Sequence, residues 1–278
     1  MATILVHIAL LAYTAGAAAF LTWLVRPSPG LVRAGRMLLL VGVVVHFAAF
    51  GVSLGVAGAG LGIKAWKGGE LFSLLAAVTV TGYLLLDFRY ELPVAGAFVG
   101  PFTVAVMVPA HLVHSNARAI APEVSHSIAL FVHVGAAAIG TAVLALSFGL
   151  SVLYLASERQ MKEKRPGRLF ARLPSLDLLD RAGYRLAVWG FVFLSLAIAT
   201  GSLVSREVTG SPFPFPVAPK EGFAVLAWAL FASLIQARLV AGWRGRRVAM
   251  LVVAGFVLLV GTYVGLLSAA PALRGTAA

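Results

Sequence analysis

Histidine is the residue type whose placement in this chain suggests chemistry. The six histidines all lie within apolar stretches or at their ends. His46 lies in the middle of one such stretch, and His133 lies near the start of another. A neutral imidazole is a good axial ligand for heme iron, and an apolar slot suits the porphyrin. The alternative is that each histidine simply hydrogen-bonds a neighbouring helix, as membrane histidines often do.

The remaining histidines gather at the ends of the apolar stretches. His111 and His114 close one stretch, His126 opens the next, and His7 lies near the start of the chain. The spacing of His111 and His114 places both on one helix face. No third ligand is obvious nearby, so the spacing does not favour zinc.

Acidic residues and cysteines limit the other kinds of chemistry. The ten Asp and Glu residues fall in turns, loops or span ends. A proton-driven transporter usually needs an acid within the membrane, so this distribution argues against transport, as does the lack of obvious inverted repeats. The sequence contains no cysteine, which excludes disulfides, thiolate metal sites and thioether attachment to this chain.

The composition assigns the chain to the membrane proteins. Of its 278 residues 60% are hydrophobic and 12% are charged, and the mean hydropathy is +0.96. A single soluble core does not need that much apolar surface. We therefore expect an all-α polytopic membrane protein, with residues 1–278 forming one integral membrane domain. The net charge of +12 then reflects basic loops rather than nucleic-acid binding.

Eight apolar stretches are long enough to cross a bilayer as helices. They cover residues 3–25, 37–60, 71–87, 92–113, 127–155, 184–204, 221–241 and 249–270. The third is the shortest. The first is kept as a span rather than a signal peptide, because it has no basic start and no clear cleavage site follows it.

Basic residues predict the orientation. One set of loops holds sixteen Lys and Arg residues and the other set holds six. The richer set should face the cytoplasm, which places both termini on the outer, periplasmic side. The longest loop, 158–185, is among the cytoplasmic ones. Within it, Leu173–Asp180 reads as a short amphipathic helix on the inner surface, capped by Ser175, and the loop's basic residues favour anionic lipid there.

Two short segments border the seventh stretch. Pro219-Lys220-Glu221 is an ordinary helix start, with Pro early and an acid in the first turn. Gly242-Trp243-Arg244-Gly245-Arg246-Arg247 is typical of an interfacial Trp followed by a stop-transfer cluster. Taken singly, each segment has this simple explanation, and only their order and separation carry information.

The ordered set of segments resembles the cytochrome c assembly membrane proteins of the CcsA/HemX type. The resemblance covers most of residues 40 to 270. With the compact loops and the length, it is closer to the HemX-like branch. The segments that carry it are Leu71–Ala76, Asp87–Tyr90, Gly96–Pro101, Phe131–Val134, Leu153–Arg159, Leu173–Asp177, Tyr184–Phe191 and Pro219–Arg247.

The resemblance implies an eight-helix protein of the cell inner (plasma) membrane that binds or moves heme. In the CcsA branch heme is presented outside to apocytochrome c, usually with a second membrane subunit. The HemX branch is linked to the control of a soluble heme-biosynthesis enzyme. His133 matches an outer histidine that ligates heme iron, and His46 matches a mid-membrane histidine of the HemX-like branch. Both would then ligate heme b.

The sequence departs from the family pattern where the family binds heme. The loop Thr209–Ala218 has no Trp, and Ala218 stands in place of Asp. Gln236 replaces a family histidine, and the second outer histidine is missing after the eighth span. Phe213 and Phe215 are left to cover a porphyrin face, beside Lys220 and Glu221. His111 is the best candidate for a second iron ligand.

The motifs and their departures from the family pattern leave three functions open. The first is heme handling near the outer face, without catalysis, since the chain offers positioning rather than a nucleophile. The second is a non-catalytic membrane regulator of heme biosynthesis that acts through the loop 158–185. The third is a small-molecule transporter, which the scarcity of intramembrane acids disfavours.

Overall fold

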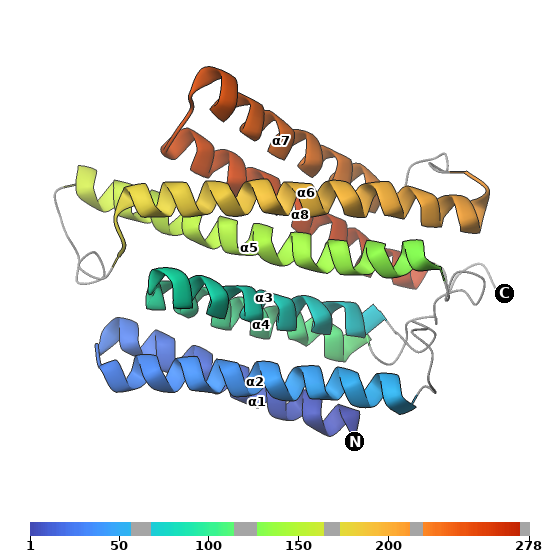
Figure 1. Ribbon diagram of the computed structural model, residues 1–278, viewed down its shortest axis with the longest axis horizontal. Coiled ribbons are helices and arrows are strands. Elements are labelled where there is room, and N and C mark those ends of the chain that lie inside the picture. Colours follow the sequence, from blue (N-terminus) through green and yellow to red (C-terminus); the bar gives the residue numbers. More distant parts are fainter. Residues whose placement is uncertain (57–67, 114–126, 164–172, 212–218, 273–278) are drawn as a thin grey trace. The chain divides into compact units, whose positions relative to one another are not determined.

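The computed structural model describes residues 1–56, 68–113, 127–163, 173–211 and 219–272, and within these ranges the ordered elements are helices. Figure 1 shows their course along the chain. The helices are α1 (Ala2–Val25), α2 (Pro29–Val56), α3 (Gly68–Tyr90), α4 (Pro93–Val113), α5 (Ile128–Lys162), α6 (Leu176–Thr209), α7 (Pro219–Ala241) and α8 (Arg246–Ala272).

The helices have the length and composition of membrane spans. Within the described residues seven are long and apolar enough to cross a bilayer, and the described apolar part of α4, Pro93–Val108, is shorter. A hydrocarbon core of ~30 Å needs about 20 helical residues. Many large apolar side chains are also exposed, as lipid contact requires. The prediction of an all-α, multi-pass membrane protein is therefore confirmed, while the side on which the termini lie stays a prediction.

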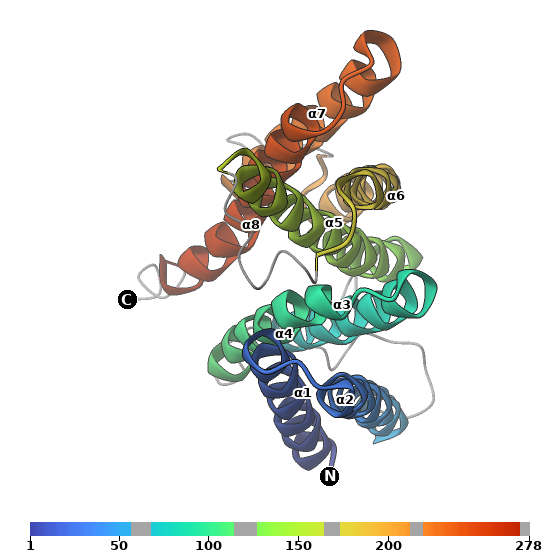
Figure 2. The ribbon, with the colours of Figure 1, turned by 90° about the vertical axis from the view of Figure 1, so that its left-hand side faces the viewer.

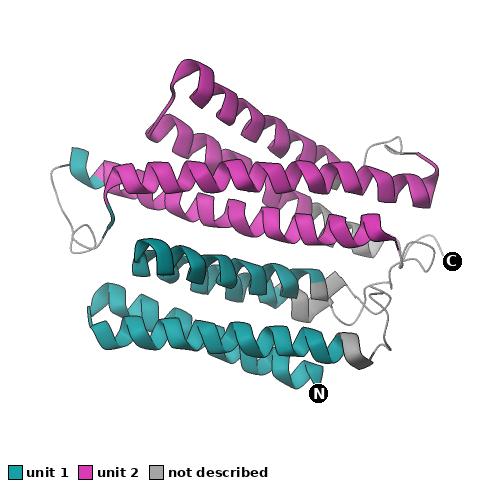
Figure 3. Cartoon of the chain, viewed as in Figure 1, with its two compact units in different colours: residues 1–126, 160–174 teal, residues 127–159, 175–278 magenta. Residues whose placement is uncertain are grey.

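The chain divides into two compact units, coloured separately in Figure 3. Unit 1 comprises residues 1–126 and 160–174 and contains α1 to α4. Unit 2 comprises residues 127–159 and 175–278 and contains α5 to α8, apart from the last residues of α5. In Figures 1 and 2, α1 and α2 lie side by side within unit 1.

Small residues bring the helices of unit 1 close together. A Cβ atom added at Gly100 of α4 would come within 2.6 Å of the Cβ and 2.7 Å of the Cα of Ala17 in α1. The ring of Phe20 fills the space left by two further glycines, Gly35 in α2 and Gly96 in α4. Without a hydrophobic driving force between helices in lipid, such close packing supplies the attraction.

Unit 2 combines close packing with hydrogen bonds between helices. The Ser147 hydroxyl of α5 donates to the Gly183 carbonyl of α6 (2.8 Å). The Trp228 indole of α7 donates to the Ser195 hydroxyl of α6 (2.8 Å). These contacts set the rotation of each helix about its axis, because an apolar contact alone is not directional.

The expectation of a separate amphipathic helix over Leu173–Asp180 is wrong. Ser175 does cap a helix, since its hydroxyl accepts the amide of Leu178 (3.3 Å). That helix continues without a break as α6 to Thr209. Gly183 does not end it, because Gly183 is buried against α5 and its carbonyl is held by Ser147.

Several span limits also differ from those read from hydropathy. The third helix extends to Gly68–Tyr90 and is longer than α4, so the third span is not the shortest. The second begins at Pro29 rather than at residue 37. In both cases the helix continues past its apolar part, because the flanking Arg and Glu residues are good helix formers although they are not apolar.

Gly100→Ala should destabilise unit 1. The added methyl group meets the backbone of α1, which moves less easily than a side chain, so a cost of about 1–3 kcal/mol is expected. The thermal unfolding midpoint in detergent measures it. Gly51→Ala is the matched control, because nothing lies within 4 Å of a Cβ at Gly51. Equal midpoints for the two variants would contradict the close α1–α4 packing.

Candidate functional site

His133 lies in the second turn of α5 and faces α6 within unit 2. Its Nδ1 lies 2.7 Å from the carbonyl oxygen of Ala197. A carbonyl only accepts hydrogen bonds, so Nδ1 carries the proton and donates it. In the neutral ring Nε2 then holds the lone pair. Metal-ligating histidines are commonly fixed in this way, through the nitrogen that does not bind the metal.

A glycine makes this contact possible. A Cβ atom at Gly201 of α6 would lie 2.8 Å from Cε1 and 2.9 Å from Nδ1 of His133. Gly201 follows Ala197 by one helical turn, so the two residues form one surface under the ring. The neighbours on α5 are apolar, with Leu130 and Val134 buried and Phe131 about half exposed. The imidazole thus sits partly buried in apolar surroundings.

His46 has a different environment, inside unit 1. Its side chain is fully buried in α2. Nδ1 lies 3.2 Å from the Tyr13 hydroxyl of α1, and Nε2 lies 2.6 Å from the Ser73 hydroxyl of α3. The Phe50 ring stacks on the imidazole with the centroids 5.3 Å apart. His46 therefore links three helices, and iron could reach a ring nitrogen only by replacing one of these hydroxyls.

The other expected site residues are placed only in part. Phe213 and Phe215 lie outside the described residues. The backbone positions of His111 and Lys220 belong to α4 and α7, but their side chains lie outside the described part. Glu221 lies in the first turn of α7, and its Oε2 is buried without a hydrogen-bond partner.

The expected site residues are divided between the two units. His46 and His111 belong to unit 1, whereas His133 and Glu221 belong to unit 2. Among the described residues no group of three or more His, Asp or Glu side chains could hold a metal ion. Among the described residues, an iron site would therefore rest on one or two histidines rather than on a closed ligand cluster.

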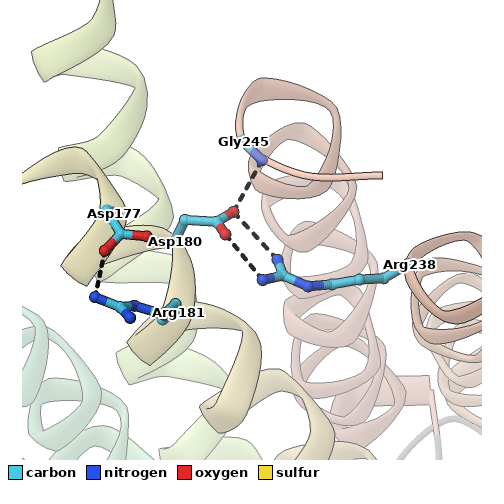
Figure 4. Close-up of polar contacts among 5 residues, drawn as sticks. All are labelled: Asp177, Asp180, Arg181, Arg238 and Gly245. Carbon is cyan, nitrogen blue, oxygen red and sulfur yellow. Dashed lines mark hydrogen bonds and ion pairs between the residues drawn. The ribbon is translucent and has the colours of Figure 1, made fainter. Parts of the chain in front are cut away.

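Sequence reasoning missed a buried ion pair at the other end of unit 2, shown in Figure 4. The Asp180 carboxylate of α6 accepts two hydrogen bonds from the Arg238 guanidinium of α7, with N–O distances of 2.9 and 3.2 Å. It also accepts the backbone amide of Gly245, just before α8 (2.8 Å). We refer to Asp180, Arg238 and Gly245 as the α6–α8 clamp, because it joins three helices at one carboxylate.

Two tyrosines complete the surroundings of the clamp. The Arg238 guanidinium lies over the Tyr184 ring, 4.1 Å from its centroid. A Cβ at Gly245 would lie 2.6 Å from the Tyr154 hydroxyl, and Gly245 has φ of +67°, which favours glycine. Gly242 also has a positive φ (+63°). The two glycines of the Gly-Trp-Arg-Gly segment were therefore the feature of the sequence that could have indicated this tight turn.

Unit 1 contains a second buried carboxylate that pairs with arginine. Asp87 of α3 is 3% exposed and accepts hydrogen bonds from Arg36 of α2, with N–O distances of 2.6 and 3.1 Å. Asp87 was expected in a turn, and Arg36 in a loop. Both lie in helices instead, and their bidentate contact fixes the ends of α2 and α3.

Comparison with known proteins agrees with the membrane fold and the ordered segments. A family profile described as "Cytochrome C assembly protein" matches residues 6–270. The chain belongs to the cytochrome c assembly protein family.

Individual curated relatives match a shorter part of this chain than the family profile does. The cytochrome c biogenesis protein CcsA of Gloeothece citriformis is 36% identical over 100 residues, which cover 36% of this chain and 30% of that protein. The CcsA protein of Rippkaea orientalis is 33% identical over 119 residues, which cover 43% and 34%. The match to CcsA of Trichormus variabilis is 35% over 117 residues, covering 41% and 33%. The chain thus spans about a third of the length of the curated relatives it matches.

Asp180→Asn should destabilise unit 2. Asp180 and Arg238 are both 13% exposed, so the variant leaves a largely buried guanidinium without its counter-charge, at a cost of about 3 kcal/mol. Asp177→Asn is the control. Asp177 pairs with Arg181 on the exposed face of the same helix, where a pair contributes less than about 1 kcal/mol. Thermal unfolding in detergent distinguishes the two, and an equal loss would contradict a structural role for the clamp.

Proposed function

We propose that this protein binds heme at His133 and handles it for cytochrome c assembly near the outer face of the membrane. The observation that carries the proposal is the hydrogen bond from His133 Nδ1 to the Ala197 carbonyl (2.7 Å). This bond leaves Nε2 as the nitrogen with the lone pair that iron would take. Membership in the cytochrome c assembly protein family supports the proposal independently.

The residues around His133 fit a porphyrin on chemical grounds. A neutral imidazole with its proton on Nδ1 matches this hydrogen bond and would need no counter-charge. Leu130 and Val134 are apolar, and Gly201 allows the ring to lie close to α6. Heme b, when bound, would supply the iron. The chain's own part is to orient the imidazole and to provide apolar surroundings that exclude water.

Two further histidines remain candidate ligands from the sequence resemblance. His111 lies at the end of α4, and its side chain is outside the described residues. His46 would have to give up its 2.6 Å contact with Ser73 or its contact with Tyr13. Exchange of a buried hydrogen bond carries a cost, which makes His46 a weaker candidate than His133. Phe213, Phe215, Lys220 and Glu221 are proposed to border the same heme.

The role we propose is presentation rather than catalysis. The sequence contains no cysteine, so a thioether bond would have to use cysteines of apocytochrome c. A second membrane subunit is a further proposed partner. The departures from the family pattern, among them Gln236 and Ala218, place the chain nearer the HemX-like branch in this proposal. The protein would reside in the cell inner membrane.

His133→Ala should reduce bound heme by at least about tenfold, because it removes the proposed iron ligand itself. Loss of a residue that only supports a metal ligand already lowers metal affinity by about tenfold or more. The measurement is the Soret absorbance per protein after expression with a heme supply. His7→Ala is the control, since His7 is an exposed histidine whose Nδ1 bonds Thr3 of its own helix.

Two results would overturn the assignment. Wild-type protein without a Soret band would refute heme binding. An unchanged spectrum for His133→Ala, with loss of heme in His46→Ala, would move the ligand to unit 1. Thermal unfolding midpoints of the variants separate loss of heme from loss of fold.

Gly201→Ala should weaken heme binding without touching the ligand. The new methyl group would displace the His133 ring and lengthen its contact with Ala197, so heme occupancy should fall several-fold. Gly135→Ala is the matched control, because it lies on α5 two residues after His133 with nothing within 4 Å of an added Cβ. Heme titration followed by absorbance gives both affinities. If Gly135→Ala weakens binding as much as Gly201→Ala does, the ring is not held as described.

A further inference from the structure

The connection between α7 and α8 presents an exposed cluster of positive charge, independent of any heme site. The cluster consists of Arg244 in the connection and Arg246 and Arg247 in the first turn of α8, all exposed, with Trp243 partly buried beside them. We call these four residues the arginine turn. Within the part of the chain that the structure describes, none of the three arginines has an ion-pair partner. The Arg247 guanidinium lies over the Trp243 ring, 5.4 Å from its centroid.

The α6–α8 clamp fixes the backbone that carries these arginines. The Gly245 amide between Arg244 and Arg246 donates to Asp180 (2.8 Å). The Trp243 amide donates to the carbonyl of Ala237 in α7 (3.3 Å). The two carboxylate oxygens of Asp180 are taken by Arg238 and by the Gly245 amide. The clamp therefore holds the turn without neutralising it.

Apolar residues lie directly beside the charge. Leu239 and Val240, at the end of α7, are 71% and 76% exposed, among the most exposed large apolar side chains described. Trp243 follows Val240 by three residues, and an indole is typical of the boundary between hydrocarbon and water. The molecular surface therefore changes from apolar at Leu239 and Val240 to cationic at Arg244. An anionic lipid has the same order of groups, with apolar acyl chains followed by a charged phosphate.

We infer that the arginine turn binds the headgroup of an anionic phospholipid, whose acyl chains lie along Leu239 and Val240. Guanidinium groups bind phosphate oxygens with charge-assisted, often paired hydrogen bonds. The exposed apolar side chains of Leu239 and Val240 favour a lipid over a soluble acidic peptide, because acyl chains can cover them while the headgroup meets the arginines. The phosphate of the lipid supplies the complementary charge.

The test is a titration of delipidated protein with phosphatidylglycerol and, separately, phosphatidylcholine, followed by native mass spectrometry. Wild-type protein should prefer phosphatidylglycerol. Arg246→Gln/Arg247→Gln should weaken phosphatidylglycerol binding by about tenfold and leave phosphatidylcholine binding unchanged, as expected for loss of two cations near an anionic headgroup. Arg26→Gln/Arg33→Gln is the control, since it removes two exposed arginines of unit 1 and the same net charge.

Three results would overturn the proposal. Equal weakening by both double variants would mean that net charge alone attracts the lipid. Wild-type protein without preference for phosphatidylglycerol would exclude the site. Displacement of the lipid by an excess of inorganic phosphate, to the same extent in wild type and control, would identify a site for free anions. Unchanged unfolding midpoints confirm that the variants remain folded.

Discussion

In hydrocarbon a polar side chain has to find its hydrogen-bond partner inside the protein, because no water is there to provide one. Two buried carboxylates of this chain follow that constraint. Asp87 is held by Arg36, and Asp180 is held by Arg238 and Gly245. Both arginines lie on neighbouring helices, and Gly245 lies just before α8. Apolar contacts in lipid are weakly directional, so these few polar contacts decide which faces of the helices meet.

Close approach of the backbones is the condition for such contacts. A histidine can reach a main-chain carbonyl of a neighbouring helix only if no side chain lies between them. At His133 the space is provided by Gly201, one turn after Ala197. At the clamp it is provided by Gly245, whose positive φ turns its amide toward Asp180. The many glycines of the sequence therefore place the polar groups as well as pack the helices.

The number and order of the helices could be predicted from hydropathy, and the cap at Ser175 from its residue type. The partners of the charged residues could not be predicted. Asp180 pairs with Arg238, and no local pattern connects residues so distant in sequence. The error over Leu173–Asp180 has the same origin. Its charged end suggested a surface helix, whereas Asp180 is the largely buried centre of the clamp and α6 continues past it to Thr209.

The candidate site was predictable to a similar extent. Position within apolar stretches singled out His46 and His133 equally well, but the atoms that they contact differ. Ala197 contacts His133 through its backbone carbonyl. Every residue has such a carbonyl, so the residue type at position 197 could not indicate this contact. The difference between the environments of His46 and His133 thus required the three-dimensional arrangement.

That difference in contacts has chemical consequences. Each hydroxyl beside His46 can donate or accept, so its tautomer can change as the hydroxyl groups rotate. The Ala197 carbonyl beside His133 can only accept, which keeps the lone pair on Nε2. If heme binds as proposed, His133 would thus offer Nε2 to the iron without a change of tautomer.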